Sequence, residues 1–475
     1  MSARFTVGEA AWIAGAQVVS GRTDAAVQGV FTDSRAPAPG ALFVALVGDN
    51  HDGSDFAAQA ARDGAAAVLV PSQAASRVGA QLAGSNAALL AALDTGRALG
   101  QLGRAWRSHL PDVRVVCITG STGKTSTKEL IASVLETGGP TLKTEGNLNN
   151  EVGVPLTLLR LLPAHRYAAI EAGMNHLGEI ARLASYVDPD VGIVTNVGPV
   201  HLEGCGSIEG VASAKGELFH ALRDGGTAVA NADDARVLAQ ARLSRRRMLT
   251  FGAHVTSHVR LVSAHHGGPG LRVELLFPDG KMRMAELHLI GTHNGHNAAA
   301  AAAVGLAVGL DPERIVRGLG NARTPGRRMR PVRLPGGGLL IDDCYNANPQ
   351  STKAALLTLT HLVRSQGRAI AVLGDMLELG PTELDLHRDV GRFAAGAGLA
   401  LLVCFGERAR AIGEGAVEGG VKLENVRYAT DPLEAVEIVR REARPEDVIL
   451  IKGSRGMKME RISDPLAGVA PAGGH

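Results

Sequence analysis

Aromatic side chains and net charge are both scarce in this sequence. Phe, Trp and Tyr make up 3% of its 475 residues, and 49 Lys and Arg residues stand against 47 Asp and Glu residues. Proteins that bind nucleic acids need basic surfaces, and those that bind single strands also stack the bases on aromatic rings. The composition therefore argues against nucleic-acid binding, and it provides no positive charge for attachment to a membrane surface.

Cysteines and long apolar segments are also few. The four cysteines, Cys117, Cys205, Cys344 and Cys404, lie far apart and form no CxxC pair, which predicts neither a zinc site nor a disulfide framework. The longest apolar run, residues 298–310, is too short to span a membrane, and the N-terminus lacks a secretory pattern. We expect a protein that does not cross a membrane and resides in the reducing cytoplasm.

The length of the chain predicts about three domains, because 475 residues exceed what one hydrophobic core supports. Strand-like and helix-like segments alternate, which predicts an α/β fold with parallel sheets. We place a smaller N-terminal α/β domain at residues 1–110, a central parallel-sheet domain at 111–325 and a second α/β domain at 326–475. Turn-forming residues at 324–327 mark a hinge, and the apolar-periodic stretch at residues 89–110 predicts one helix.

The central domain begins with a sequence that is typical of a phosphate-binding loop. A β-branched apolar strand at residues 113–118 leads into TGSTGKT at 119–125, and a helix-forming segment follows. In this arrangement the backbone N–H groups and the helix N-terminus bind phosphates, Lys124 meets the β- and γ-oxygens, and the hydroxyl of Thr125 reaches Mg²⁺. The residues expected around the phosphates are Gly120, Ser121, Thr122, Gly123, Lys124, Thr125 and Ser126.

This loop is shorter than the standard pattern, which has a glycine where this chain has Ile118. The Gly-Lys-Thr sequence alone is a weak signal that also occurs in ordinary loops. The strand before it and the helix after it are what favour binding of a nucleoside triphosphate.

Polar residues follow several predicted strands of the central domain. Glu171 follows the strand at residues 167–170, His201 follows the strand at 191–195, and Asn231 follows the next strand. In open α/β sheets, ligands bind at the carboxyl ends of the strands. A single Glu or His is more often structural, but three polar strand ends beside a phosphate loop favour contacts to a metal and a substrate.

Three further features allow two interpretations each. Residues 32–35 combine hydroxyls, a carboxylate and a guanidinium, which suit a phosphate-bearing ligand, although composition alone favours a surface turn. Asn294 and Asn297 at a helix start either contact a purine or cap the helix. Lys215, also at a helix start, would by itself be an ordinary solvated cation.

Taken together, these segments resemble the Mur ligase family, whose members are ATP-dependent, amide-forming enzymes of peptidoglycan assembly. The resemblance extends over nearly the whole chain, and its motifs are TGSTGKTSTKE, EGNLNNEVGVPLTLL, EAGMNHLGEI, TNVGPVHLEGCGS, AKGEL, HNGHNAAAAAA, PGRRMR, DDCYNANP and KGSRGMKME. Two of them, DDCYNANP and NLNNEVGVPLTLL, most resemble the branch that joins D-alanyl-D-alanine to UDP-N-acetylmuramoyl-tripeptide through an acyl phosphate. Cys344 and Cys205 replace a serine and an aromatic residue that are usual in the family, but neither position is a ligand there.

Two alternatives to this branch remain. A sister ligase would use the same chemistry to add another amino acid, or to add glutamate to folate. The DDCYNANP segment and the lack of the DNPR motif of the ligase that adds the third amino acid argue against it. The other alternative is a regulatory ATPase without ligase activity. It would not explain the polar residues at the strand ends of the last domain.

The resemblance implies the architecture and the cofactors. The N-terminal domain would bind the UDP-sugar, the central P-loop domain would be an ATPase, and the C-terminal ligase domain would be Rossmann-like. ATP and two Mg²⁺ ions would be required, with Thr125 and Glu171 holding one ion and His201 helping to hold the other. Lys215 would be a further metal ligand as a carbamate formed with CO₂, because an ammonium group cannot bind Mg²⁺ whereas an anionic oxygen can. The catalytic set would be Lys124, Glu171, His201 and Lys215.

The resemblance also implies the contacts to the nucleotide and to the two other substrates. Asn294 and Asn297 would contact adenine, while Arg327 and Asp342 would contact phosphate and ribose. The residues implied for the UDP-tripeptide and the dipeptide are Thr32, Asp33, Ser34, Arg35, Asn147, Asn149, Asn150, Tyr345, Asn346, Asn348, Lys452, Ser454 and Arg455. We expect a monomer whose partners are these small molecules.

Overall fold

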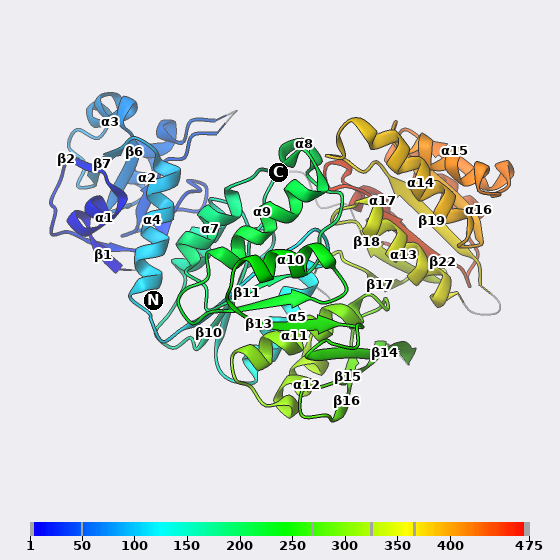
Figure 1. Cartoon of the computed structure of the whole chain (residues 1–475). Helices are drawn as coiled ribbons and strands as arrows, with labels where there is room; N and C mark the ends of the chain where they lie inside the picture. Colours follow the sequence, from blue (N-terminus) through cyan, green and yellow to red (C-terminus); the bar gives the residue numbers. More distant parts are fainter. Residues whose placement is uncertain (1–3, 49–50, 268–269, 324–325, 364–366, 470–475) are drawn as a thin grey trace.

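The computed structural model describes residues 4–48, 51–267, 270–323, 326–363 and 367–469. Three large sheets follow one another along the described chain, and helices cover them (Figure 1). We call the corresponding parts the N-terminal unit (residues 4–108), the central unit (114–321) and the C-terminal unit (330–466). Of the predicted hinge at 324–327, Thr324 and Pro325 lie outside the described residues.

The N-terminal unit contains a five-stranded sheet and a separate two-stranded pair. Its strands are β1 (Arg4–Thr6), β2 (Gln17–Ser20), β3 (Ala26–Gln28), β4 (Val30–Phe31), β5 (Leu42–Val44), β6 (Ala67–Pro71) and β7 (Ala88–Ala92). Its helices are α1 (Val7–Ala14), α2 (Ala57–Arg62), α3 (Ala75–Gln81) and α4 (Thr95–Ser108), with 3-10 turns η1 (Gly53–Phe56) and η2 (Ser72–Ala74). The strand order of the larger sheet is β2-β7-β6-β5-β4, and β1 pairs with β3.

The predicted helix at residues 89–110 is wrong in its first part, because Ala88–Ala92 forms strand β7. The side chains of this strand are all buried, and Asp94 then accepts a hydrogen bond from the backbone N–H of Arg97 and so caps α4. A short apolar run suits a buried strand and a buried helix alike. The cap decides where the helix begins.

The central unit is organised around a nine-stranded sheet. Its strands are β8 (Arg114–Thr119), β9 (Thr141–Lys143), β10 (Tyr167–Glu171), β11 (Val191–Val194), β12 (Thr227–Asn231), β13 (Arg247–Gly252), β14 (Val259–Gly267), β15 (Gly270–Leu276) and β16 (Met282–Leu287). Its helices are α5 (Lys124–Glu136), α6 (Gly153–Leu158), α7 (Glu179–Val187), α8 (Leu202–Cys205), α9 (Ile208–His220), α10 (Ala235–Leu243), α11 (Asn294–Ala307) and α12 (Pro312–Asn321). The strand order is β16-β15-β14-β13-β12-β11-β8-β10-β9.

This sheet is mainly parallel, as predicted for the central domain, but two strands at one end of it depart from that prediction. The strands from β9 to β14 run parallel, whereas β15 and β16 continue the sheet antiparallel. The sequence Asp279-Gly280 makes the turn before β16, with Gly280 at φ 76°. Side chains of β15 alternate between buried and more exposed positions, as expected for a strand at the antiparallel edge of a sheet.

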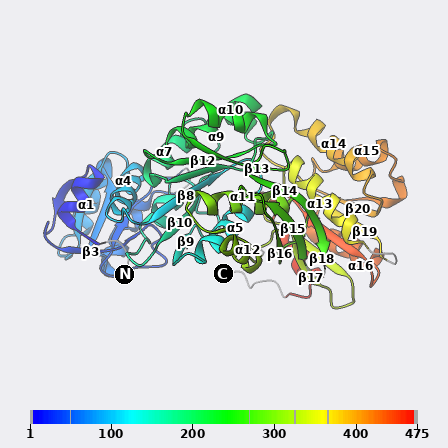
Figure 2. The ribbon, with the colours of Figure 1, turned by 60° about the horizontal axis from the view of Figure 1, so that its bottom comes forward.

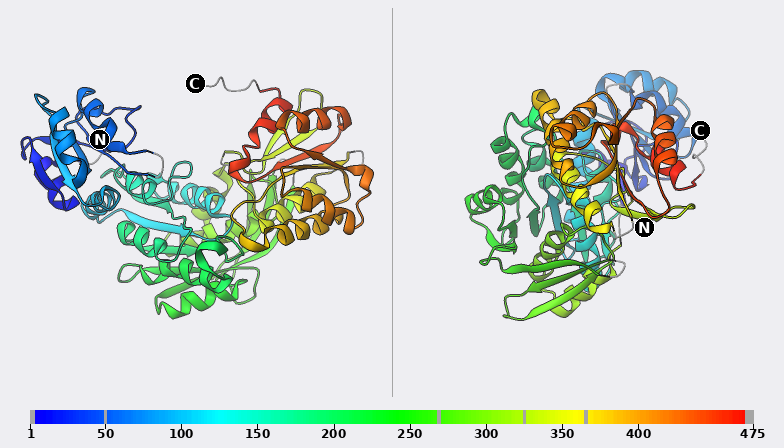
Figure 3. Two further views of the ribbon diagram at one scale, coloured as in Figure 1. Left: turned by 90° about the horizontal axis from the view of Figure 1, so that it is seen from above. Right: turned by 90° about the vertical axis from the view of Figure 1, so that its right-hand side faces the viewer.

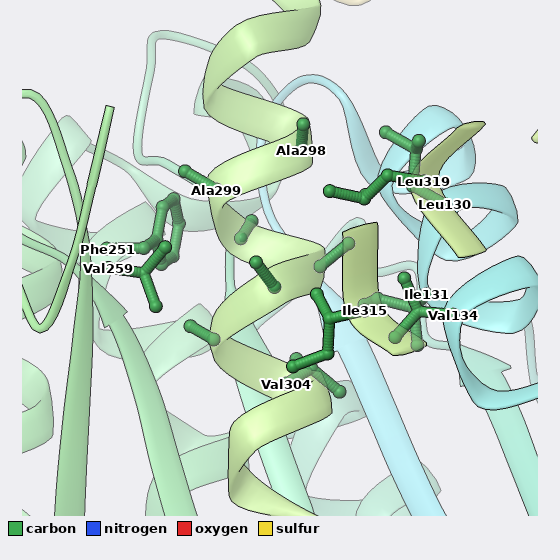
Figure 4. Close-up of a cluster of buried hydrophobic side chains, with 14 of the residues drawn as sticks. Leu130, Ile131, Val134, Phe251, Val259, Ala298, Ala299, Val304, Ile315 and Leu319 are labelled. Atoms are coloured by element: carbon green, nitrogen blue, oxygen red, sulfur yellow. The ribbon is translucent and has the colours of Figure 1, made fainter. Parts of the chain in front are cut away.

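Helix α11 is the core of the central unit. It packs between β13 and β14 on one side and α5 and α12 on the other (Figure 4). The residues Ala298–Ala303 are all buried, and these small side chains allow the neighbouring elements to approach closely. The dense packing fixes the start of α11, which carries two of the predicted nucleotide contacts.

The C-terminal unit contains a six-stranded sheet. Its strands are β17 (Arg330–Arg333), β18 (Leu339–Asp343), β19 (Ala369–Gly374), β20 (Leu399–Phe405), β21 (Val426–Ala429) and β22 (Val448–Lys452). Its helices are α13 (Pro349–Leu362), α14 (Glu383–Ala395), α15 (Arg410–Glu418), α16 (Pro432–Glu442) and α17 (Glu460–Leu466), with 3-10 turns η3 (Gly380–Thr382), η4 (Leu423–Asn425) and η5 (Arg455–Met457). The order is β17-β18-β22-β19-β20-β21, with only β17 antiparallel to its neighbour among these described strands.

The N-terminal and C-terminal units lie at opposite ends of the central unit (Figures 1 and 3). Strand β14 is on the side of the central sheet that faces the C-terminal unit (Figure 2). There His266 of β14 and His361 of α13 have ring centroids 6.0 Å apart. Within the described part of the chain, no helix combines the length and the apolar character needed to cross a membrane.

Candidate active site

A cavity of about 920 Å³ lies between the central and C-terminal units. The carboxyl ends of β8, β10, β11 and β12 open into it from the central sheet, and those of β18 and β22 open into it from the C-terminal sheet. Ligands of α/β proteins bind at this end of the strands. The predicted residues that line the cavity are Ser121, Thr122, Gly123, Lys124, Thr125, Ser126, Asn147, Asn149, Asn150, Glu171, His201, Asn294, Asn297, Tyr345, Asn346, Asn348, Lys452 and Arg455.

The phosphate loop connects β8 to α5 and has the backbone that its glycines predict. Gly123 has φ 76°, and a Cβ atom there would lie 2.8 Å from the amide oxygen of Asn297. Asn196, at the end of β11, holds the loop from the other side, because its side-chain oxygen accepts a hydrogen bond from the backbone N–H of Thr122 at 2.9 Å. Asn196 therefore fixes the loop by a hydrogen bond, whereas Asn297 only lies close to it, and Asn196 was not among the residues predicted for the site.

Glu171 presents an unpaired carboxylate oxygen beside this loop. Its side chain is 2% exposed, and its Oε1 atom accepts a hydrogen bond from Asn149 at 3.0 Å. Its Oε2 atom is buried without a hydrogen-bond partner among the described residues. A buried carboxylate oxygen is costly unless a donor or a cation satisfies it. The hydroxyl of Thr125 lines the same cavity, so the two oxygen donors suit a hard cation such as Mg²⁺.

Lys215 and His201 are basic groups whose charged forms are disfavoured. Lys215 lies within α9 and is 1% exposed, and no acidic side chain of the described residues forms an ion pair with it. Burial, and then the positive charge of Lys124, lower the pKa of Lys215 well below its usual value. Burial and the same lysines lower the pKa of His201 to about 4. His201 lines the cavity, whereas Lys215 does not. Both side chains favour the neutral form: a neutral amine at Lys215 can react with CO₂, and a neutral imidazole at His201 can bind a metal.

The predicted metal ligands do not make a complete metal site by themselves. Across the described ranges, no three His, Cys, Asp or Glu side chains are grouped so that they could hold an ion. The set of Thr125, Glu171, His201 and Lys215 includes a hydroxyl and an amine, so it depends on modification of the lysine and on oxygens supplied by a nucleotide.

The two asparagines at the start of α11 are linked to each other and, through the hydroxyl of Thr127, to α5. The amide N–H of Asn297 donates to Asn294 at 2.8 Å, and that of Asn294 donates to the carbonyl of Ile290 at 2.8 Å. Each amide retains a second N–H for a ligand. Beside them, His296 lies 3.2 Å from Asp233, and both residues line the cavity although sequence reasoning did not name them as site residues.

The C-terminal wall of the cavity is built around Lys452. Its ammonium group contacts Asp343 at 2.6 Å and donates to the carbonyl of Asn346 at 2.9 Å. Asn348 caps α13 by accepting from the backbone N–H of Ser351. Ser454 lies behind the wall and does not line the cavity. These contacts fix the backbone of the DDCYNANP segment along the cavity.

Two adjacent arginines precede this unit and point to different places. Arg327 is bound by Asp464 at 2.8 Å and by the buried Asp342 at 3.0 Å, and neither Arg327 nor Asp342 lines the cavity. Arg328 does line it, stacks over the ring of Tyr345 at 4.0 Å, and contributes to lowering the pKa of Lys124. Arg328 was missed because the PGRRMR sequence gives no sign of which arginine faces inward.

Residues 32–35 belong to the N-terminal unit and do not line the cavity. Arg35 forms an exposed ion pair with Asp33 at 2.8 Å. Asn150, which does line the cavity, accepts a hydrogen bond from the backbone N–H of Gly153 at the start of α6. The predicted substrate residues are therefore distributed over all three units.

Sequence models of three protein-family domains match this chain. They are the Mur ligase family catalytic domain at residues 26–107, the Mur ligase middle domain at residues 118–305, and the Mur ligase glutamate ligase domain at residues 327–455.

Individual relatives match over most of their length. The UDP-N-acetylmuramoyl-tripeptide–D-alanyl-D-alanine ligase of Escherichia coli (strain K12) is 38% identical over 92% of this chain and 93% of the relative. A crystal structure of MurF from Acinetobacter baumannii is similar with a TM-score of 0.88 at 30% identity, covering 98% of this chain and 99% of that one. The MurF ligase of Thermotoga maritima, solved in complex with ADP, has a TM-score of 0.80 at 26% identity, covering 93% of this chain and 97% of that one.

Proposed function

The chain belongs to the Mur ligase family, and on this premise we propose that it joins D-alanyl-D-alanine to UDP-N-acetylmuramoyl-tripeptide in peptidoglycan synthesis, using ATP. The observation that carries the proposal is the cavity in which a phosphate loop, the buried oxygen of Glu171 and the DDCYNANP segment face one another. The curated relatives of 38% and 34% identity bear the name of this ligase.

The reaction requires a carboxylate to attack a triphosphate, so negative charge must be neutralised. The terminal carboxylate of the tripeptide attacks the γ-phosphorus of ATP, the bond from that phosphorus to the β,γ-bridging oxygen breaks, and ADP leaves, so that an acyl phosphate forms. The free amine of the dipeptide then attacks the carbonyl carbon, loses a proton and forms the amide bond, and inorganic phosphate leaves. Lys124 and Arg328 both line the cavity and would meet the phosphates, and such fixed charges stabilise phosphoryl transfer electrostatically.

Thr125 and Glu171 fit one Mg²⁺ ion, because the unpaired oxygen of Glu171 requires a cation or a donor. His201 and a carbamate on Lys215 would hold a second ion. The metal supplies charge neutralisation at the phosphates when bound. The lowered pKa of Lys215 supports the carbamate, since only the free amine reacts with CO₂. Asn294 and Asn297 would bind the adenine base of ATP. Arg327 and Asp342, which pair with each other, would stabilise the C-terminal unit next to the nucleotide.

The other substrates would bind on either side of the nucleotide. Residues 32–35 of the N-terminal unit and the cavity asparagines Asn147, Asn149 and Asn150 would bind the UDP-tripeptide. Residues of the C-terminal wall, with Tyr345 and Asn346 among them, would bind the dipeptide. The ligase would act as a monomer in the cytoplasm, with residues 1–110, 111–325 and 326–475 as its domains.

The experiment that tests the proposal measures phosphate release from ATP with UDP-muramoyl tripeptide, in the presence and absence of D-alanyl-D-alanine. We expect release that depends on both substrates and a product heavier by the dipeptide. Diaminopimelate, lysine and glutamate should not replace the dipeptide. Ligation of one of these amines would favour a sister ligase, and release indifferent to every acceptor would favour a regulatory ATPase.

A further inference from the structure

Glu378 of the C-terminal unit and His201 of the central unit meet across the cavity. The Nδ1 atom of His201 lies 3.6 Å from a carboxylate oxygen of Glu378, and both residues line the cavity. His201 directly precedes α8, and Glu378 lies between β19 and η3. The loop before α14 accordingly lies beside α8 (Figure 1).

Both residues have a left-handed backbone. His201 has φ 52° and Glu378 has φ 64°, a region that residues other than glycine seldom adopt. Such conformations persist only where the surroundings fix them, and they gather at functional sites. The directions of the two side chains are therefore set by constrained backbones.

The loop that carries Glu378 is anchored from within the C-terminal unit. The backbone N–H of Met376 donates to the ring of His387 at 2.9 Å, and that of Leu377 donates to the hydroxyl of Ser454 at 2.9 Å. The side chain of Glu378 is nevertheless 72% exposed, and across the described residues His201 is its one ion-pair partner. The anchored loop thus holds the carboxylate of Glu378, which has no other ion-pair partner among the described residues, beside His201 of the central unit.

We propose that Glu378 is a positioning residue for His201: its carboxylate faces Nδ1 at 3.6 Å and, with a small approach, would accept the Nδ1–H, so that Nε2 is left to the metal. The inference rests on the metal role of His201 in the proposed function. Metal-bound histidines commonly donate their other N–H to a carboxylate, which fixes the tautomer and the orientation of the ring. In this chain the carboxylate belongs to a different unit from the ligand. Metal binding and docking of the C-terminal unit therefore stabilise each other.

The test compares Glu378→Ala and Glu378→Gln with the parent enzyme in two measurements. The first is Mn²⁺ binding to protein loaded with a non-hydrolysable ATP analogue, followed by the electron paramagnetic resonance of free Mn²⁺. The second is the Mg²⁺ concentration that gives half-maximal ligation. We expect Glu378→Ala to lower the Mn²⁺ affinity about tenfold and to raise the half-maximal Mg²⁺ concentration by about the same factor, which is the lower end of such effects. The KM for the UDP-tripeptide should not change.

Glu378→Gln should lose less, because its amide oxygen still accepts a hydrogen bond. Glu407→Ala is the matched control, since it removes an exposed carboxylate from the same unit outside the cavity, and it should behave like the parent enzyme. An unchanged Mn²⁺ affinity in Glu378→Ala would overturn the inference.

His201→Ala separates this inference from the proposed function. If His201→Ala leaves Mn²⁺ binding unchanged, the metal role of His201 itself is wrong. The metal role instead requires that His201→Ala weakens Mn²⁺ binding. If Glu378→Ala then weakens Mn²⁺ binding by the same factor in the parent enzyme and in the His201→Ala variant, Glu378 does not act through His201 and the inference fails. Loss of the Glu378→Ala effect in the His201→Ala background supports it.

Discussion

The ammonium group of Lys124 donates a hydrogen bond to the carbonyl oxygen of Gly120, with 2.7 Å between the two atoms. The phosphate-loop lysine is thus bound to the first glycine of its own loop. Burial lowers its pKa, and the negative charge of Glu171 opposes that shift. The lysine occupies the inside of the loop, which is where the loop backbone would meet phosphates.

Replacing Lys124 with alanine should reduce ligation by at least about a hundredfold, because fixed charges that stabilise phosphoryl transfer contribute several kcal/mol. A coupled phosphate-release assay measures the loss, and thermal unfolding checks that the variant is folded. Lys281→Ala removes an exposed lysine of the central unit and should keep full activity. Near-normal ligation by folded Lys124→Ala would rule out the phosphate-loop assignment.

Lys215 provides a test of the carbamate. Lys215→Ala should lose most activity, and formate or acetate should restore part of it by supplying the missing anionic oxygens. Lys215→Arg should stay inactive, because a guanidinium cannot form the carbamate. An active arginine variant together with no rescue by carboxylates would show that Lys215 acts as a cation.

The same lysine should make stability depend on pH. Because burial lowers the pKa of Lys215 in the folded state, the folded protein binds fewer protons than the unfolded chain between that lowered pKa and the usual value. The free-energy cost of burying the amine is thus largest at pH values below the lowered pKa, and it disappears as the pH rises through the usual pKa of lysine. In CO₂-free buffer, Lys215→Met should therefore raise the melting temperature at neutral pH, and the gain should shrink towards pH 10.5. A gain that is constant over this range would contradict the prediction.

Arg35 should serve the UDP-tripeptide and not ATP. Arg35→Ala should raise KM for the UDP-tripeptide about tenfold or more, the effect of losing one charge-assisted contact of roughly 1.5–3 kcal/mol, while KM for ATP stays constant. Arg22→Ala is a close control, because Arg22 forms a similar exposed pair with Asp24 in the same unit. Equal effects on both substrates would speak against a dedicated substrate site.

The two adjacent arginines should have different effects when replaced. Arg328→Ala should raise KM for ATP and leave the melting temperature nearly unchanged, since Arg328 faces the cavity. Arg327→Ala should instead lower the free energy of unfolding by about 1–3 kcal/mol, because it removes the pairs with Asp342 and Asp464. Steady-state kinetics and denaturant unfolding distinguish the two, and the reverse pattern would show that Arg327 is the phosphate contact.

Local sequence patterns predicted several elements to within a few residues. The apolar strand predicted at 113–118 is β8, and the helix-forming segment after the phosphate loop is α5. Strand β7 was missed because its apolar run is ambiguous until the sheet partners are known. The antiparallel edge formed by β15 and β16 was also missed, since strand direction depends on which strands pair.

The sequence by itself determined the phosphate loop, because strand, turn and helix are consecutive and the glycines dictate the backbone locally. It also placed polar residues at strand ends, which a parallel sheet must bring to one edge. Only the tertiary structure decided that Arg328 and not Arg327 faces the cavity, that one oxygen of Glu171 has no partner, and that Glu378 reaches His201. These relationships join residues far apart in the chain or neighbours in irregular segments. There the direction of a side chain follows from the packing of whole units and leaves no periodic signal in the sequence.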